Sequence, residues 1–130
     1  MVSYFPMIKG ILIGHGKLPE TLMDVVKSIL GEVSDFEIIS NEGVSADDLE
    51  KTVNQAIEHL GTEEKIVFVD LYGGSCAQVG NKLSAKHGKI AVICGVNLPM
   101  LMKYFRYRER LNFNELVEIV KKAGQEEIKR

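Results

Sequence analysis

The chain has 130 residues, of which 45% are hydrophobic and 26% charged, and its formal net charge is −2 at pH 7. This length suits one domain with a real hydrophobic core, and the composition is ordinary for a soluble globular protein. The slightly acidic balance argues against a nucleic-acid-binding module, and no apolar run approaches the roughly 20 residues of a membrane span. We therefore expect one domain over residues 1–130, with no nucleic-acid partner and no insertion into a membrane.

Cysteine content and the first residues indicate the compartment. The two cysteines, Cys76 and Cys94, are too few for a disulfide framework and lack the spacing of a metal site. The segment from Met1 to Lys9 lacks the basic start, apolar core and small-residue cleavage site of a signal peptide. These features favour a reducing, cytoplasmic setting, and we expect neither a metal ion nor an organic cofactor.

In chain order, short apolar runs alternate with segments whose apolar residues recur at helical spacing. The runs at residues 8–13, 36–40, 66–69 and 90–94 are predicted to be strands. Strands that alternate with helices are typical of an α/β fold. We therefore expect an open, mostly parallel four-stranded sheet with helices on both faces.

Capping residues and prolines predict where the helices begin and end. The residues assigned to helix starts are Pro19, Ser45, Ser75, Pro99 and Asn114. The residues assigned to the last turn of a helix or to the position after it are Leu30, Gly31, Gly61, Lys86 and Gly124.

The most informative motif, Gly14-His15-Gly16, follows the first predicted strand. In a parallel sheet such a strand-to-helix junction lies at the carboxyl edge, where open α/β folds bind ligands. The flanking glycines let a large group approach the imidazole, and histidine exchanges protons or phosphoryl groups near neutral pH. We interpret His15 as a candidate nucleophile; the alternative is an exposed loop histidine without a chemical role.

A second loop at the same edge supplies complementary groups. Asp70 follows the third predicted strand, where its carboxylate could accept a hydrogen bond from His15 and stabilise a positively charged ring. Gly73-Gly74-Ser75 then leads into a helix, whose free N–H groups and dipole favour an anion. Taken singly, Asp70 could merely cap its loop and the glycines could form a turn. Together they are the parts needed for phosphoryl transfer through a histidine.

Three segments resemble a known family. Residues 10–16 (GILIGHG), 69–75 (VDLYGGS) and 95–100 (GVNLPM) are similar, in order, to the mannose-family enzyme IIA domain of the bacterial phosphotransferase system. The similarity runs from about Ile8 to Gly124. It implies a phosphotransferase in which His15 is phosphorylated, Asp70 orients His15, and the backbone at Gly74 and Ser75 holds the phosphoryl group.

The resemblance also implies partners. A domain of this family accepts phosphate from the phosphocarrier HPr and passes it to a IIB component, and the membrane components IIC and IID complete sugar uptake. Family members commonly form homodimers that exchange a C-terminal antiparallel strand, and Glu126–Arg130, short and mostly charged, could form one here. Apolar residues near Leu98, Met100 and Leu101 are expected to offer contact area to these partners.

Three other functions remain open from the sequence. The phosphoryl-donor subunit of a dihydroxyacetone kinase resembles the same family and differs in its partner. A receiver domain would be phosphorylated on Asp70, although it needs acidic residues after the first strand to bind magnesium. A thiol enzyme would use Cys76, with a pKa lowered by the helix N-terminus and His15 as base, whereas core packing is the simpler interpretation. His59 and His87 are interpreted as structural residues at helix ends.

Overall fold

A computed structural model describes residues 5–61 and 64–130; residues 1–4, part of the segment examined for a signal peptide, lie outside it. Within the described residues, four parallel strands form one sheet in the order β2-β1-β3-β4. They are β1 (Lys9–Gly14), β2 (Phe36–Ser40), β3 (Lys65–Val69) and β4 (Ile90–Cys94). The predicted parallel α/β fold is confirmed, and β2 and β4 agree with the sequence prediction residue for residue.

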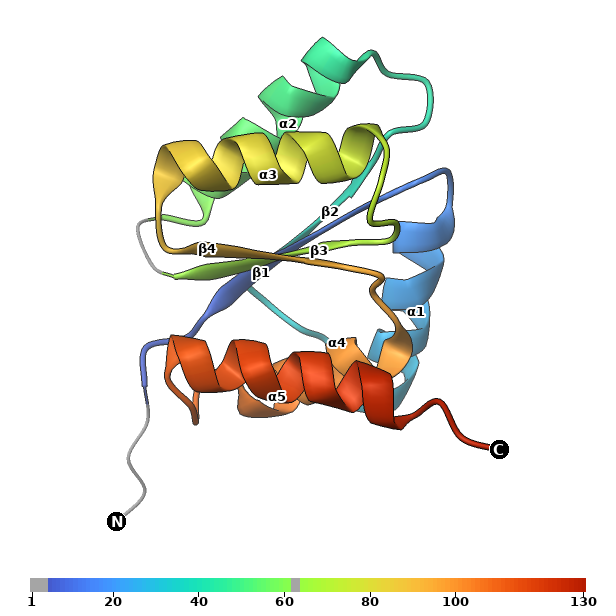
Figure 1. Ribbon diagram of the computed structural model, residues 1–130, viewed down its shortest axis with the longest axis vertical. Coiled ribbons are helices and arrows are strands. Elements are labelled where there is room, and N and C mark those ends of the chain that lie inside the picture. Colours follow the sequence, from blue (N-terminus) through green and yellow to red (C-terminus); the bar gives the residue numbers. More distant parts are fainter. Residues whose placement is uncertain (1–4, 62–63) are drawn as a thin grey trace.

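The helices of the described residues cover both faces of this sheet (Figure 1). They are α1 (Leu18–Leu30), α2 (Ala46–His59), α3 (Ser75–His87), α4 (Leu98–Tyr107) and α5 (Phe113–Glu126). Helices α2 and α3 pack on one face, and α1, α4 and α5 pack on the other. None of the helices in the described ranges is long and apolar enough to cross a membrane.

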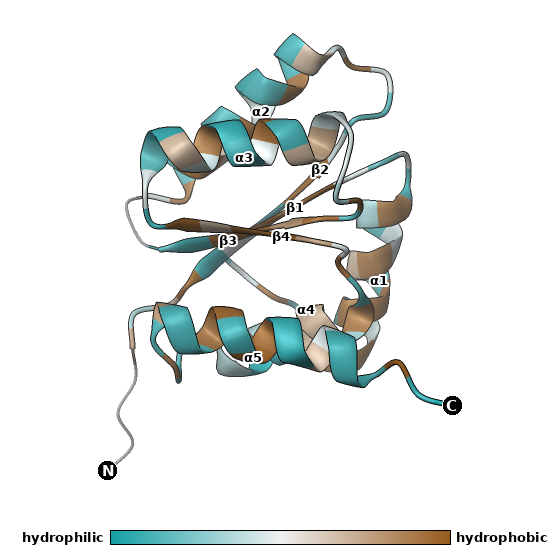
Figure 2. Ribbon diagram, viewed as in Figure 1, coloured by the Kyte–Doolittle hydropathy of each residue, from teal (hydrophilic) through white to brown (hydrophobic). Residues whose placement is uncertain are grey.

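The central strands β1 and β3 contribute side chains to two hydrophobic cores, one on each face of the sheet. Ile11 and Ile13 pack with the residues of α2 and α3, whereas Leu12 packs with those of α1, α4 and α5, and all three side chains are fully buried. Figure 2 shows the apolar sheet between helices whose outer faces are largely hydrophilic. Burial on both faces explains why these strands are continuous apolar runs in the sequence rather than alternating patterns.

The sheet has a topological switch point between β1 and β3. The chain leaves β1 through α1 on one face to reach β2, and it leaves β3 through α3 on the other face to reach β4. The loops after these adjacent strands therefore turn to opposite faces at the carboxyl edge (Figure 1). Open α/β sheets bind their ligands at this kind of position.

The start of α5 differs from the sequence prediction. The side chain of Asn112 accepts a hydrogen bond from the Glu115 N–H at 2.9 Å, and the Glu115 side chain accepts one from the Asn112 N–H at 3.2 Å. This reciprocal pair is a capping box. The prediction of Asn114 as the cap is therefore wrong, because only Asn112 has a glutamate three residues later.

The end of α5 also differs. Gly124 lies inside the helix rather than after it, at the point where α5 packs on Met100 of α4. The helix continues to Glu126, which pairs with Lys122 at 3.7 Å. The antiparallel strand considered for Glu126–Arg130 is not formed in the described chain, because its first residue belongs to α5 and residues 128–130 have no regular structure.

We expect Gly124→Ala to lower the free energy of unfolding by about 1–3 kcal/mol. The added Cβ would lie 2.5 Å from the Cγ of Met100, and this overlap outweighs the higher helix propensity of alanine. Urea denaturation measures the change. In a Met100→Ala background, which removes the obstacle, the same substitution should be neutral or stabilising; an equal loss in both backgrounds would contradict the packing argument.

Candidate functional site

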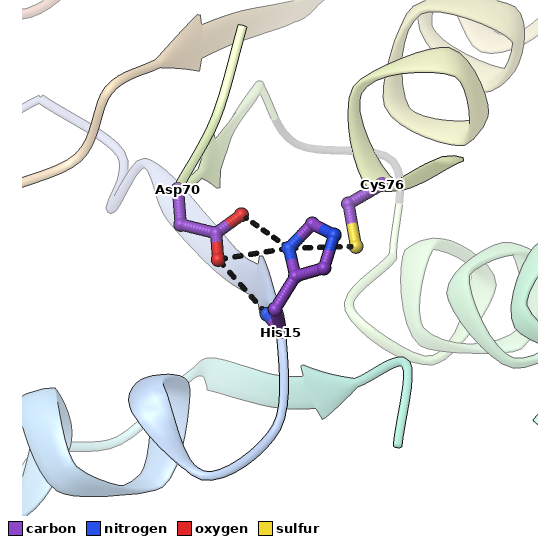
Figure 3. A group of neighbouring side chains, drawn as sticks. All are labelled: His15, Asp70 and Cys76. Carbon is purple, nitrogen blue, oxygen red and sulfur yellow. Dashed lines mark hydrogen bonds and ion pairs between the residues drawn. The ribbon is translucent and has the colours of Figure 1, made fainter. Parts of the chain in front are cut away.

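The pairing of β1 with β3 brings His15 and Asp70 together. Ile13 lies opposite Val69 in the parallel register, so the residues that follow them leave the sheet side by side. The His15 Nδ1 lies 3.0 Å from Oδ2 of Asp70 and 3.1 Å from its Oδ1 (Figure 3). The structure thus joins the two side chains that the sequence analysis paired.

The Asp70 carboxylate is held by backbone groups as well as by the ring. Its Oδ2 accepts a hydrogen bond from the His15 N–H at 2.9 Å, and its Oδ1 accepts one from the Leu71 N–H at 2.9 Å. The Asp70 side chain is 7% exposed and that of His15 is 41% exposed. An ionised carboxylate can only accept, so in the neutral ring Nδ1 carries the proton and donates a hydrogen bond to Asp70, and Nε2 keeps its lone pair.

Gly14 leaves the space that this contact needs. A Cβ at this position would lie 3.2 Å from Oδ2 of Asp70 and 2.8 Å from Cγ of Pro19 in α1. A larger residue would therefore push the start of α1 or the carboxylate away. The glycine thus makes room for groups of the protein itself, the Pro19 ring and the Asp70 carboxylate.

Ser40, the last residue of β2, and Asn41, the residue after it, hold the loop that carries His15. The Gly16 N–H donates to Oδ1 of Asn41 at 3.3 Å, and the Ser40 hydroxyl donates to the Gly16 carbonyl at 2.6 Å. The sequence motifs do not single out Ser40 and Asn41. Their place at the carboxyl end of a parallel strand, on the same edge as His15, is the signal that could have found them.

The start of α3 lies beside the second ring nitrogen. Gly74, the residue before the helix, has φ +95°, in the left-handed region that favours glycine. A Cβ there would lie 4.0 Å from Nε2 of His15. No side chain caps the described α3 and its first turn has no acidic residue, whereas side chains cap α2, α4 and α5. Its first N–H groups, from Ser75 onward, are therefore available to an anion near Nε2.

Cys76 in the first turn of α3 is the third side chain at this site. Its Sγ lies 4.0 Å from Nδ1 of His15, and the residue is fully buried (Figure 3). Burial raises the pKa of the thiol and the charge of Asp70 raises it further, against a smaller lowering by a hydrogen bond with Ser75. The expectation of a lowered pKa is therefore wrong, and a neutral thiol makes the thiol-enzyme interpretation unfavourable.

These three residues also form a group that could hold a metal ion. One ligand atom from each of His15, Asp70 and Cys76 lies within 4.8 Å of the other two. A motif search along the sequence does not reveal this group, because Cys76 is far from His15 in the chain and the parallel sheet brings them together.

The other two histidines lie at helix ends away from this edge. His59 is the last residue of α2, and its Nδ1 lies 2.9 Å from Oε1 of Glu37. His87 is the last residue of α3, and its Nε2 lies 2.7 Å from Oδ1 of Asn54. Both therefore have polar partners that suit the structural role expected of them.

The sequence predicts an apolar contact surface near Leu98, Met100 and Leu101, but only Leu98 of these three is partly exposed. Met100 and Leu101 are 5% and 0% exposed, because α4 packs against the sheet and against its neighbours α1 and α5, so they are core residues. Exposed apolar side chains instead come from the loops and helix start at the carboxyl edge. We call them the apolar rim: Leu18, Val44, Leu71 and Tyr72.

Comparison with known proteins adds independent information. Residues 9–121 match the family model EIIA-man, described as the PTS system fructose IIA component. The fructose-specific EIIA component of Bacillus subtilis (strain 168) is 28% identical over 124 residues, which cover 92% of this chain and 84% of that protein. The mannose-specific EIIAB component of Escherichia coli (strain K12) is 32% identical over 127 residues, covering 95% of this chain and 39% of that protein.

A solved structure agrees with this similarity. The crystal structure of the phosphotransferase system component EIIA from Streptococcus agalactiae superposes with a TM-score of 0.89 at 29% identity. The match covers 95% of this chain and 97% of that one. Sequence and fold therefore support the resemblance drawn from the three loops, and they do not favour the receiver or the kinase-donor interpretation.

We expect Cys76 to react slowly with iodoacetamide in the folded protein at neutral pH. Its raised pKa leaves little thiolate below that pKa, and burial blocks the reagent. In a Cys94→Ala variant, the folded chain should be alkylated at least about 100-fold more slowly than the same chain in urea. Mass spectrometry of the time course measures both rates. Rapid alkylation of the folded chain would restore the thiol-enzyme interpretation.

Proposed function

Because the chain belongs to the EIIA-man family of phosphotransferase-system fructose IIA components, we propose that residues 1–130 form one IIA domain that carries a phosphoryl group between two proteins. His15 accepts the group from phospho-HPr and passes it to a IIB component, upstream of the membrane components IIC and IID. The observation that carries this proposal is the 3.0 Å contact of Nδ1 with Asp70, which leaves Nε2 beside the uncapped start of α3.

In the proposed reaction, Nε2 of His15 is the nucleophile. Its lone pair attacks phosphorus, the P–N bond to the donor histidine breaks, and that electron pair returns to the donor ring. The Nδ1 proton stays on His15 throughout. The Asp70 carboxylate stabilises the positive charge that the ring gains.

The backbone at the start of α3 is proposed to hold the phosphoryl oxygens. The N–H groups at Gly74 and Ser75 would donate to them, and the helix dipole would add about 0.3–1 kcal/mol. No acidic side chain of the described first turn opposes the negative charge. This arrangement stabilises the group without a metal ion.

The apolar rim is proposed as the surface that both partners use. Leu71 and Tyr72 are 58% and 88% exposed in the loop that leads from Asp70 to α3. HPr and IIB must reach Nε2 in turn, so each contact has to be small and transient. Apolar side chains on the same edge of the sheet as the partly exposed histidine offer such an area without favouring one partner.

We further propose that the protein works in the cytoplasm as a homodimer. Strand β4 is an edge of the sheet and pairs with β3 alone among the described strands. A cavity of about 490 Å³ runs beside it, with Val92, Cys94, Val117 and Ile128 among its lining residues. An open edge of this kind is a template for pairing with a second chain.

We expect His15→Ala to abolish phosphorylation while the circular dichroism spectrum stays unchanged. The measurement is transfer of ³²P from purified phospho-HPr in excess EDTA, with acid lability identifying phosphohistidine. His59→Ala and His87→Ala are matched controls that should label as the unaltered chain does. Labelling of the His15→Ala variant would refute the assigned nucleophile, and failure of the unaltered chain to label in EDTA would refute metal-free transfer.

We expect Asp70→Asn to slow phosphoryl transfer by about 10- to 1000-fold. The amide keeps the shape but loses the charge that stabilises the ring and holds the proton at Nδ1. Nitrogen-15 NMR of the imidazole should show Nδ1–H in the unaltered protein and a mixture of both tautomers in the variant. An unchanged rate together with an unchanged tautomer would show that Asp70 does not orient His15.

A further inference from the structure

We propose that His15, Asp70 and Cys76 form a zinc-binding site, and that zinc bound there prevents phosphorylation of His15. The binding follows from the geometry of the three side chains. Its inhibitory effect rests on the proposed function, because it concerns the nitrogen to which phosphate is transferred.

The three side chains supply three kinds of zinc ligand at suitable separations. The Nδ1 of His15 lies 3.0 Å from Oδ2 of Asp70 and 4.0 Å from Sγ of Cys76, and a ligand atom from each residue lies within 4.8 Å of the others (Figure 3). Tetrahedral zinc, with bonds of about 2.0–2.3 Å, places its ligands about 3.3–3.8 Å apart. Adjustments of about 1 Å or less in the side chains would therefore complete the site.

Two of the ligands are already fixed by the fold. Asp70 is anchored by the N–H groups of His15 and Leu71, and Cys76 is buried in the first turn of α3. The side chain of His15, which is 41% exposed, leaves a path from solvent. Three protein ligands and one open position are the arrangement of zinc sites that keep a bound water.

The charges also favour a divalent cation. With a neutral imidazole, one carboxylate and one thiolate, a Zn²⁺ complex has no net charge, which suits a site where Asp70 is 7% exposed. Binding forms the Zn–N, Zn–O and Zn–S bonds and releases the thiol proton of Cys76 to solvent. The Nδ1 proton must also leave, since zinc needs the lone pair at that atom.

That displaced proton explains the inhibition. A neutral imidazole carries one proton, so when zinc occupies Nδ1 the proton moves to Nε2. A protonated Nε2 has no lone pair with which to attack phosphorus. Zinc would therefore block the nucleophile by changing the tautomer of His15, without covering the apolar rim.

Cobalt absorption tests the site directly. We expect the metal-free full chain to bind one equivalent of Co²⁺ with a thiolate-to-cobalt charge-transfer band that Zn²⁺ abolishes by displacement. Cys76→Ala should lack this band, whereas Cys94→Ala, which removes the other free cysteine, should keep it. No band in the unaltered chain, or the same band in Cys76→Ala, would overturn the proposal.

Phosphorylation kinetics test the consequence. For each variant, the rate of labelling by phospho-HPr with Zn²⁺ is divided by its own rate in EDTA. For the unaltered chain and for Cys94→Ala we expect a ratio of about 0.1 or less, which means at least about tenfold inhibition. For Cys76→Ala we expect a ratio near one. A cobalt band without inhibition would refute the tautomer argument. Absence of labelling both in EDTA and with Zn²⁺ would overturn the carrier function and the competition with it, while the cobalt band decides the site by itself.

Discussion

The register between β1 and β3 determines where chemistry can occur in this protein. With Ile13 opposite Val69, the backbone and the ring of His15 both reach Asp70 across the end of the sheet. A shift by one residue would turn the buried side chains of β1 to the wrong faces and would also separate this pair. The hydrophobic pattern that fixes the two cores therefore also fixes the site, so the reactive geometry depends on the burial of residues far from it.

The sequence predicts the sheet well and the C-terminal helices less well, for physical reasons. Strands buried on both faces form continuous apolar runs between turn residues, so their limits are visible locally. The start of α5 depends on distinguishing Asn112 from Asn114, and only the reciprocal bond with Glu115 does so. In the sequence, Gly124 looks like the residue that ends a helix, because the neighbouring residues do not show that it contacts Met100 of another helix.

The site is predictable where it follows from topology and not where it follows from packing. Parallel strands end at one edge, so His15 and Asp70 could be paired before any coordinates. The position of Cys76 depends on how the first turn of α3 faces the ring, and its raised pKa depends on burial that a helix-dipole argument ignores. Met100 had the appearance of partner surface because periodicity does not show that α4 packs against the sheet and against both of its neighbouring helices, α1 and α5.

A phosphoryl carrier must accept its group and release it with similar ease, and this site suits that requirement. The dipole of a helix start stabilises an anion by about 0.3–1 kcal/mol, which is less than a fixed cation provides through its charge-assisted bonds. In the proposed mechanism Asp70 acts on the ring rather than on the phosphate, so its stabilisation is greatest while charge moves during transfer. The carboxylate also keeps the single imidazole proton at Nδ1. If His15 is the nucleophile, as proposed, its reactivity depends on where that proton resides, and any ligand that moves it to Nε2 would switch the carrier off.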